Sequence, residues 1–250
     1  MKTEKHAKTL LRSWATFLLG SMLCATTAWC IPDLQLDIEG GTWIAGTAST
    51  DETVYDVENP FTLYALVQKS FYEANPTLQY HISAAIVPQT GENVDFGSFI
   101  VDEVVYNLAN TTYGVPVLWN APKGTDGTDL PRHSIYETAF AEINFSPNPG
   151  YLATAYNSQL NPGGPADNPL PNPDGTMIYV PFTVDIEGMK VGYTLHFDLY
   201  VTPANGDVVD FAPFSHDAQS AALVPDGGWT LALLGGALVG VAMLQRKFAA

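Results

Sequence analysis

The chain has 250 residues, with 26 Asp and Glu against 10 Lys and Arg, which gives a formal net charge of −16 at pH 7. Such an acidic surface repels phosphate backbones and anionic lipid headgroups, and it argues against nucleic acid as a partner. Hydrophobic residues make up 46% of the chain, which excludes a wholly unfolded polar chain and allows a packed core.

The N-terminal segment 1–30 has the features of a secretory signal peptide. Its n-region contains the basic residues Lys2, Lys5, Lys8 and Arg12. An apolar h-region follows over residues 14–27, and small residues allow signal peptidase to cleave after Ala28 or Cys30. An uncleaved N-terminal anchor is the alternative. Because Cys24 and Cys30 are the only cysteines, cleavage after Cys30 leaves a domain without disulfides or thiolate ligands.

Residues 31–223 are expected to form one exported domain made of β-strands. Residues 34–39 (LQLDIE) alternate apolar and polar side chains with period two, which is typical of a half-buried strand. Further segments rich in β-branched and aromatic residues are 61–67, 80–87, 98–106, 136–145, 177–184 and 191–201. Clusters of Gly, Pro, Asn and Asp separate them, as turns require. The pattern predicts an all-β domain, an antiparallel β-sandwich of jelly-roll type.

One long segment interrupts this pattern. Residues 146–176 are crowded with Pro, Asn and Gly and are not expected to hold a regular ladder. Loops of this length in a compact domain are either functional or mobile insertions, and a mobile insertion is the expectation here.

The C-terminal segment 224–250 has the composition of a sorting signal. It opens with the motif Val224, Pro225, Asp226, Gly227 and Gly228. An uncharged apolar run over residues 229–244 follows, and at about 1.5 Å per residue it gives a helix slightly shorter than a bilayer core. Arg246 and Lys247 close the run as a basic membrane stop. The segment therefore predicts a transmembrane helix preceded by a short recognition motif.

This tail resembles the PEP-CTERM class of bacterial sorting signals, and most closely its VPDSG-CTERM variant. Gly227 stands where the variant usually has Ser. The resemblance implies recognition at residues 224–228 by an exosortase-type enzyme and removal of the helix that follows. The helix would hold the protein at the inner membrane before processing, and the product would reach the cell surface or the extracellular matrix.

The exported domain resembles the choice-of-anchor N family of bacterial surface proteins. The matching segments are 34–42 (LQLDIEGGT), 61–66 (FTLYAL), 195–200 (LHFDLY) and 211–218 (FAPFSHDA). The resemblance implies surface display and carries no activity or site residues.

Histidines beside carboxylates are the candidate catalytic or metal-ligating residues. His133 follows Asp129 in the sequence DLPRHS, and His216 precedes Asp217. A histidine oriented by a carboxylate can bind a metal or transfer protons, so these loop residues form a candidate site. His81 and His196 lie on predicted strands, where packing or solvent exposure is expected instead.

Calcium is a possible ligand of this acidic domain, although no cofactor is required by the sequence. The candidate ligands are Asp126, Asp129, Asp207 and Asp210, whose loop spacing would suit a hard cation. They do not match the EF-hand pattern, and Asp residues that form turns are the alternative. Glu137 and Glu142 would lie on opposite faces of a strand, which argues against a shared glycosidase cleft.

The sequence predicts a non-enzymatic surface or matrix protein associated with exopolysaccharide or the cell envelope. One alternative is a carbohydrate-binding module that stacks sugars on loop aromatics, for which the candidates are Tyr106, Tyr113, Trp119, Tyr151 and Tyr156. A second alternative is a secreted hydrolase that uses the region of His133 or His216.

Overall fold

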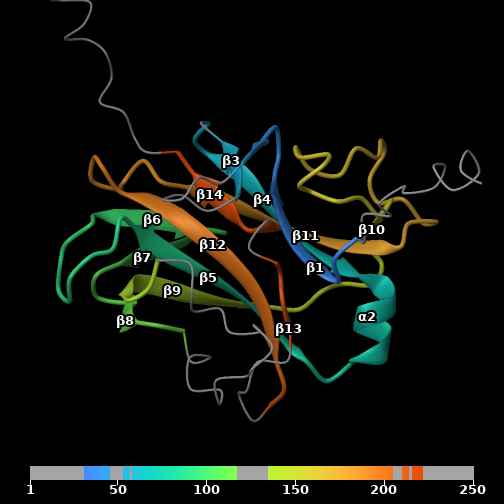
Figure 1. Cartoon of the computed structure of the whole chain (residues 1–250), viewed down its shortest axis with the longest axis horizontal. Coiled ribbons are helices and arrows are strands. Elements are labelled where there is room, and N and C mark those ends of the chain that lie inside the picture. Colours follow the sequence, from blue (N-terminus) through green and yellow to red (C-terminus); the bar gives the residue numbers. More distant parts are fainter. Residues whose placement is uncertain are drawn as a thin grey trace, which may run out of the picture. The chain divides into compact units, whose positions relative to one another are not determined.

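The computed structural model describes residues 31–45, 53–56, 58–116, 135–204, 210–213 and 216–221. These residues form two β-sheets and one short helix, α2 (Lys69–Ala74) (Figure 1). The predicted all-β class with antiparallel sheets is therefore confirmed. The predicted signal peptide, sorting motif and transmembrane helix lie outside the described residues. Within the described part of the chain, no helix has the length and apolar character needed to cross a membrane.

The first sheet has six strands, and its main order is β1-β4-β11-β6-β7. Its strands are β1 (Leu34–Ile38), β4 (Phe61–Gln68), β6 (Ser98–Val101), β7 (Val104–Asn107), β10 (Leu152–Ala153) and β11 (Met177–Asp185). All of its pairs are antiparallel, and β10 pairs with β11 beside the main order.

The second sheet has eight strands, and its main order is β2-β3-β14-β12-β5-β9-β8. Its strands are β2 (Thr42–Ile44), β3 (Thr53–Asp56), β5 (Gln79–Val87), β8 (Thr112–Gly114), β9 (Thr138–Phe145), β12 (Thr194–Thr202), β13 (Asp210–Phe211) and β14 (Ala218–Ser220). β14 pairs with β3 in parallel, whereas the other described pairs of this sheet are antiparallel.

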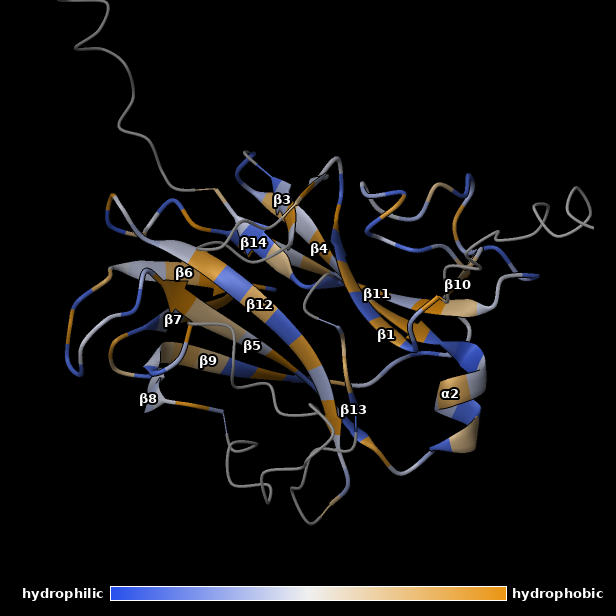
Figure 2. Cartoon of the chain, viewed as in Figure 1, coloured by the Kyte–Doolittle hydropathy of each residue, from blue (hydrophilic) through white to orange (hydrophobic). Residues whose placement is uncertain are grey.

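The two sheets share one hydrophobic core. Phe61 of β4 meets Phe197 of β12 edge to face, and Phe182 of β11 meets Phe145 of β9 in the same way. The core-facing residues of β12 are Leu195, Phe197, Leu199 and Val201. The alternation of apolar and polar residues is visible along β12 in Figure 2. Because each such apolar side chain stabilises the fold by about 1.5–3 kcal/mol on burial, this alternation fixes which face of the strand points inward.

The order of strands within the sheets differs from a jelly roll. In a jelly roll the pairs are nested, so that strands early in the chain pair with the last ones in reverse order. Here β4 pairs with β11 and β5 pairs with β12, so consecutive strands pair with consecutive strands. The orders β1-β4-β11-β6 and β14-β12-β5 correspond to the A-B-E-D and G-F-C orders of immunoglobulin-type sandwiches.

The predicted strand over residues 98–106 is instead a hairpin of β6 and β7. Its two central residues, Asp102 and Glu103, have φ angles of 46° and 69°. Positive φ at both positions is the geometry of a type I′ turn, which usually contains Asn-Gly or Asp-Gly. Because Glu103 occupies the position where Gly is common, no typical turn residues mark this hairpin.

The long loop 146–176 is packed against β1 through hydrogen bonds. Tyr156 Oη donates to Asp37 Oδ2 at 2.8 Å, and the amides of Gly163 and Gly164 donate to the same carboxylate at 3.1 and 2.8 Å. Gln35 adds a bond to the carbonyl of Tyr156 at 3.0 Å. The expected mobile insertion is therefore a docked loop that covers the outer face of β1, and it includes the short strand β10.

Candidate functional site

The outer face of the eight-stranded sheet carries a row of buried polar side chains. On β12 these are His196, Asp198, Tyr200 and Thr202, which alternate with the core-facing residues. On β5, His81 lies opposite Tyr200 and Ser83 lies opposite Asp198. Each of these six side chains is buried, so this face is a polar interior rather than a solvated surface.

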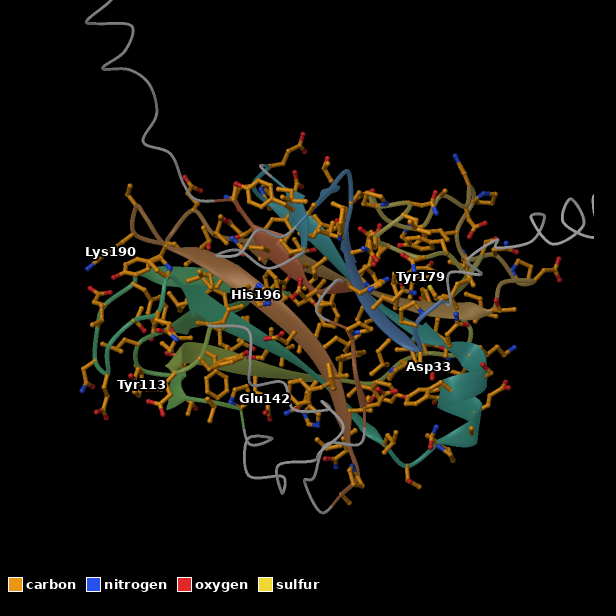
Figure 3. The ribbon with its side chains drawn as sticks, in the orientation of Figure 1. Asp33, Tyr113, Glu142, Tyr179, Lys190 and His196 are labelled. Carbon is orange, nitrogen blue, oxygen red and sulfur yellow. The ribbon has the colours of Figure 1, made fainter. Side chains whose placement is uncertain are left out.

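His196 lies between two carboxylates at one end of this row. Its Nε2 is 3.2 Å from Asp217 Oδ2 and 3.5 Å from Asp198 Oδ1. His196 is 0% exposed, Asp217 is 1% exposed and Asp198 is 2% exposed. His196 is labelled on β12 in Figure 3.

The strand pairing explains why these three residues meet. His196 and Asp198 are two residues apart on β12, so they point to the same face of the sheet. β14 pairs antiparallel with β12, with His196 opposite Gln219 and Phe197 opposite Ala218. Continued by one residue, this register places Asp217 beside Asp198. The site therefore needs two strands that are separated along the chain.

Burial and mutual attraction act in opposite directions on the triad. Burial disfavours the charged form of His196, but the charges of Asp217 and Asp198 outweigh it, and the pKa of His196 lies well above its usual range. Burial raises the pKa of Asp217 to about 6, although His196 favours the ionised form. Attraction within the triad therefore favours a charged His196, whereas burial opposes the ionised form of Asp217.

A hydrogen-bonded chain extends from Asp198 across the sheet. Tyr136 Oη donates to Asp198 Oδ2 at 2.7 Å, and Ser83 Oγ lies 2.6 Å from Tyr136 Oη. Burial, followed by the charge of Asp198, raises the pKa of Tyr136 well above its usual range, so the phenol remains a hydrogen-bond donor. Asp198 is consequently held with one oxygen on Tyr136 and the other toward His196.

A second polar cluster surrounds His81 at the other end of the row. The His81 ring stacks on Tyr200 with centroids 5.1 Å apart, and its nitrogens contact Asn144 Oδ1 at 2.5 Å and Thr202 Oγ1 at 2.9 Å. Tyr200 Oη donates to Glu142 Oε2 at 2.7 Å. Unlike the triad, this cluster reaches the surface, because Glu142 and Asn144 are exposed.

A surface hollow of about 590 Å³ opens beside this second cluster. Its polar lining includes His81, Glu142 and Asn144, and its aromatic lining includes Tyr72 and Phe145. Glu142 is labelled in Figure 3. A hollow with aromatic walls and a few fixed polar groups is suited to a small polar ligand.

The predicted histidine site is only partly described. His133 lies outside the described residues, as does Asp129. His216 is buried, and its Nε2 lies 3.1 Å from Asn157 Oδ1 in the docked loop. Burial lowers the pKa of His216 to about 4. Asp217, in contrast, joins His196, a residue that the sequence had assigned to simple packing or solvent exposure.

Of the four predicted calcium ligands, one lies in the described part of the chain. Asp126, Asp129 and Asp207 lie outside it. Asp210 is described, and its Oδ1 accepts the amide of Phe211 at 2.8 Å. Burial is the main reason why the pKa of Asp210 is raised. This bond is local to the backbone, as in the alternative to calcium that the sequence offered, but Asp210 lies in β13 and not in a turn.

The aromatic candidates for sugar stacking divide into packed and exposed residues. Tyr106 stacks on Phe99 with ring centroids 5.2 Å apart, and Tyr156 is bonded to Asp37. Tyr113 and Tyr151 are 39% and 48% exposed. Trp119 lies outside the described residues.

The two candidate glutamates line different hollows. Glu142 borders the hollow beside His81, whereas Glu137 borders a separate one of about 600 Å³ with Tyr113 and Tyr136. This agrees with the expectation that they do not share a cleft.

Comparisons with known proteins identify the C-terminal segment. Residues 224–248 match the family described as the VPDSG-CTERM motif. No match was found among curated proteins or among solved structures. The family match covers the predicted sorting motif, the apolar run and the basic stop, and it leaves the resemblance to the choice-of-anchor N family untested. The chain thus carries a PEP-CTERM-like sorting signal of the VPDSG-CTERM kind, which indicates an exported, membrane-associated protein.

Proposed function

We propose that this protein is a non-enzymatic surface or matrix component that an exosortase-type enzyme sorts at residues 224–228. The observation that carries the proposal is the match of residues 224–248 to the VPDSG-CTERM motif. Signal peptidase removes residues 1–30, and the apolar run 229–244 holds the chain at the inner membrane until processing. The β-sandwich then remains at the cell surface or in the matrix, as the resemblance to choice-of-anchor N proteins implies.

The character of the described domain supports a role other than catalysis. The described residues contain one cluster of interacting titratable groups that could hold a metal, His196, Asp198 and Asp217, and all three are at most 2% exposed. A substrate cannot reach reacting groups that are enclosed in this way. The secreted hydrolase alternative would depend on His133, which lies outside the described residues, or on the buried His216.

The sorting step can be tested by following the C-terminus of the exported chain. The full-length protein is produced in a Gram-negative host with and without its exosortase, and the C-terminal peptide is identified by mass spectrometry. We expect loss of residues 229–250 only when the exosortase is present. Pro225→Ala should abolish this processing, whereas the neighbouring substitution Ala222→Ser should leave it unchanged. Equal processing of Pro225→Ala and the wild type would contradict the proposal.

A second function, carbohydrate binding, is favoured by the hollow beside His81. Its aromatic wall contains Tyr72 and Phe145, and sugar faces stack on such rings. Its polar groups are already fixed, because Tyr200 holds Glu142 and His81 holds Asn144 through hydrogen bonds. Fixed polar groups lose little entropy when they bind the hydroxyls of a sugar.

The carbohydrate function is tested by titrating the protein with exopolysaccharide fragments from its own host. Glu142→Ala removes an exposed hydrogen-bonding group from the hollow and should weaken binding by about tenfold. Glu187→Ala removes an exposed glutamate from a turn outside the hollow and should have no effect. If both variants bind like the wild type, or if the wild type binds no fragment, the hollow is not a sugar site.

A further inference from the structure

His196, Asp198 and Asp217 have the composition of a divalent metal site. One imidazole nitrogen and one oxygen from each carboxylate lie within 4.8 Å of one another. Imidazole together with carboxylates suits zinc and other first-row transition metals, whereas calcium prefers oxygen ligands alone. This chemistry separates the site from the calcium ligands predicted on the loops.

The distances between the ligand atoms also fit a bound metal. At metal–ligand distances of about 2.0–2.2 Å, a tetrahedral arrangement separates neighbouring ligand atoms by about 3.4 Å. His196 Nε2 lies 3.2 Å from Asp217 Oδ2 and 3.5 Å from Asp198 Oδ1. Both Asp217 oxygens are buried, and the carboxylate interacts with the side chains of His196 and Thr53. The carboxylate of Asp217 thus faces His196 with fewer hydrogen bonds than normally satisfy a buried acid.

The charges of the site also favour a bound divalent cation. Two ionised carboxylates carry two negative charges, of which a protonated His196 would neutralise only one. The described residues include two lysines and no arginine, and Lys69 and Lys190 pair with the surface acids Glu73 and Asp95. A divalent cation beside a neutral His196 would neutralise both carboxylates, which matters because an uncompensated charge is costly in a buried site.

The surroundings of Asp198 resemble the outer shell of a metal centre. Metal-bound carboxylates are generally held in place by a further hydrogen bond. Tyr136 Oη supplies such a bond to Asp198 Oδ2, and Ser83 Oγ lies 2.6 Å from Tyr136 Oη. This leaves the second oxygen of Asp198 facing His196.

From this geometry we infer that His196, Asp198 and Asp217 bind one divalent transition-metal ion, with zinc as the representative species, in a structural site that fastens β14 to β12. Water or a further group would complete the coordination. Because the ligands are fully enclosed, the ion is expected to enter while the chain folds. The inference does not depend on the sorting or sugar-binding proposals.

The inference is tested with the full-length chain, purified in detergent, unfolded in a chelator and refolded with or without Zn²⁺. We expect one zinc per chain by elemental analysis and a higher melting temperature in the loaded protein. Co²⁺ loading should give the visible absorption bands of a low-coordinate nitrogen and oxygen site. A wild-type protein that retains no stoichiometric metal, with an unchanged melting temperature, would show that the triad is an ion cluster without metal.

Variants then assign the ion to this site. Asp217→Asn preserves the side-chain volume but removes a charged ligand, and it should weaken zinc binding by more than about tenfold. Tyr136→Phe removes the hydroxyl that donates to Asp198 and contacts Ser83, and it should weaken binding by about 10–100-fold. The matched control is His81→Gln, which changes the other strand histidine on the same face and should retain full zinc binding. Unchanged zinc affinity in Asp217→Asn would place the metal elsewhere and overturn the assignment.

Discussion

The hydroxyl of Tyr80 is a buried polar group without a hydrogen-bond partner among the described residues. The Tyr80 ring packs between Tyr72 and Phe145, with centroid distances of 6.2 and 5.7 Å. Burial, followed by the proximity of Tyr72, raises the pKa of Tyr80 to about 12. This single atom is therefore expected to lower the stability of the fold in two separate ways.

At neutral pH, Tyr80→Phe should stabilise the protein by about 1 kcal/mol, because it removes an unsatisfied buried hydroxyl and keeps the ring. Chemical denaturation measures this change. Tyr200→Phe is the matched control, since it deletes a hydroxyl that donates to Glu142 at 2.7 Å, and it should destabilise by about 1 kcal/mol. Destabilisation by Tyr80→Phe would mean that the hydroxyl has a favourable partner.

The raised pKa of Tyr80 also predicts an alkaline effect. Because the folded-state pKa of about 12 exceeds the ordinary value of 10, the contribution of Tyr80 to stability is complete below pH 10. As the pH rises from 10 toward 12, Tyr80 ionises in the unfolded chain before it ionises in the folded protein, and the folded state loses stability relative to the unfolded one. Melting temperatures across this window should therefore fall less steeply in Tyr80→Phe than in the wild type.

At the scale of single elements, the β6–β7 hairpin contains a turn whose residues have unfavourable backbone angles. Asp102 and Glu103 both adopt positive φ. Glu103→Gly removes the steric cost at one position and should stabilise the protein by roughly 0.5–1 kcal/mol, after allowance for the greater freedom of glycine in the unfolded chain. Thermal unfolding of the variant measures this gain.

Asp102→Gly is the natural comparison for that experiment. It relieves the same backbone cost but removes the bond in which the Thr183 amide donates to Asp102 Oδ1 at 2.8 Å. The two effects offset each other, so we expect little net change. A Glu103→Gly protein that is less stable than the wild type would show that the turn is not strained by its side chain.

The same elements show where a sequence determines structure locally and where it does not. Alternation in β1 and the apolar segments of β4, β5 and β12 mark these strands, because burial of one face requires that pattern. The β6–β7 turn escaped prediction because its backbone is imposed by strand pairing with β11 rather than by turn-forming residues. The docking of the loop 146–176 depends on Asp37, which lies more than 100 residues before its partners.

The candidate sites likewise combine features that the local sequence shows with features that depend on long-range strand pairing. His196 and Asp198 are two residues apart on a strand, so their common face could have been read from the sequence. Asp217 was recognised as a candidate, but its partnership with His196 depends on the register of β14 against β12. The hollow beside His81 likewise requires the pairing of β5 with β9 and β12, a long-range contact that periodicity does not reveal.

For the molecule as a whole, the sorting signal and the domain are linked through the last described strand. Within the described residues, β14 is three residues long and lies between β3 and β12. The sorting motif begins four residues after the end of β14. The segment that directs the protein to its destination is therefore attached to one of the shortest strands of its sheet.

Because the C-terminal segment is attached at β14, the buried triad could resist force that is applied through this segment. If the tail is held at the membrane before processing, as the sorting proposal implies, a pull on the domain would enter the fold at β14. The backbone hydrogen bonds of a three-residue strand resist little force by themselves. Asp217, directly before β14, contacts His196 on the long central strand β12, so part of the load would pass from the short strand β14 to β12. The triad would then keep β14 attached to β12 while the C-terminal tail is under tension.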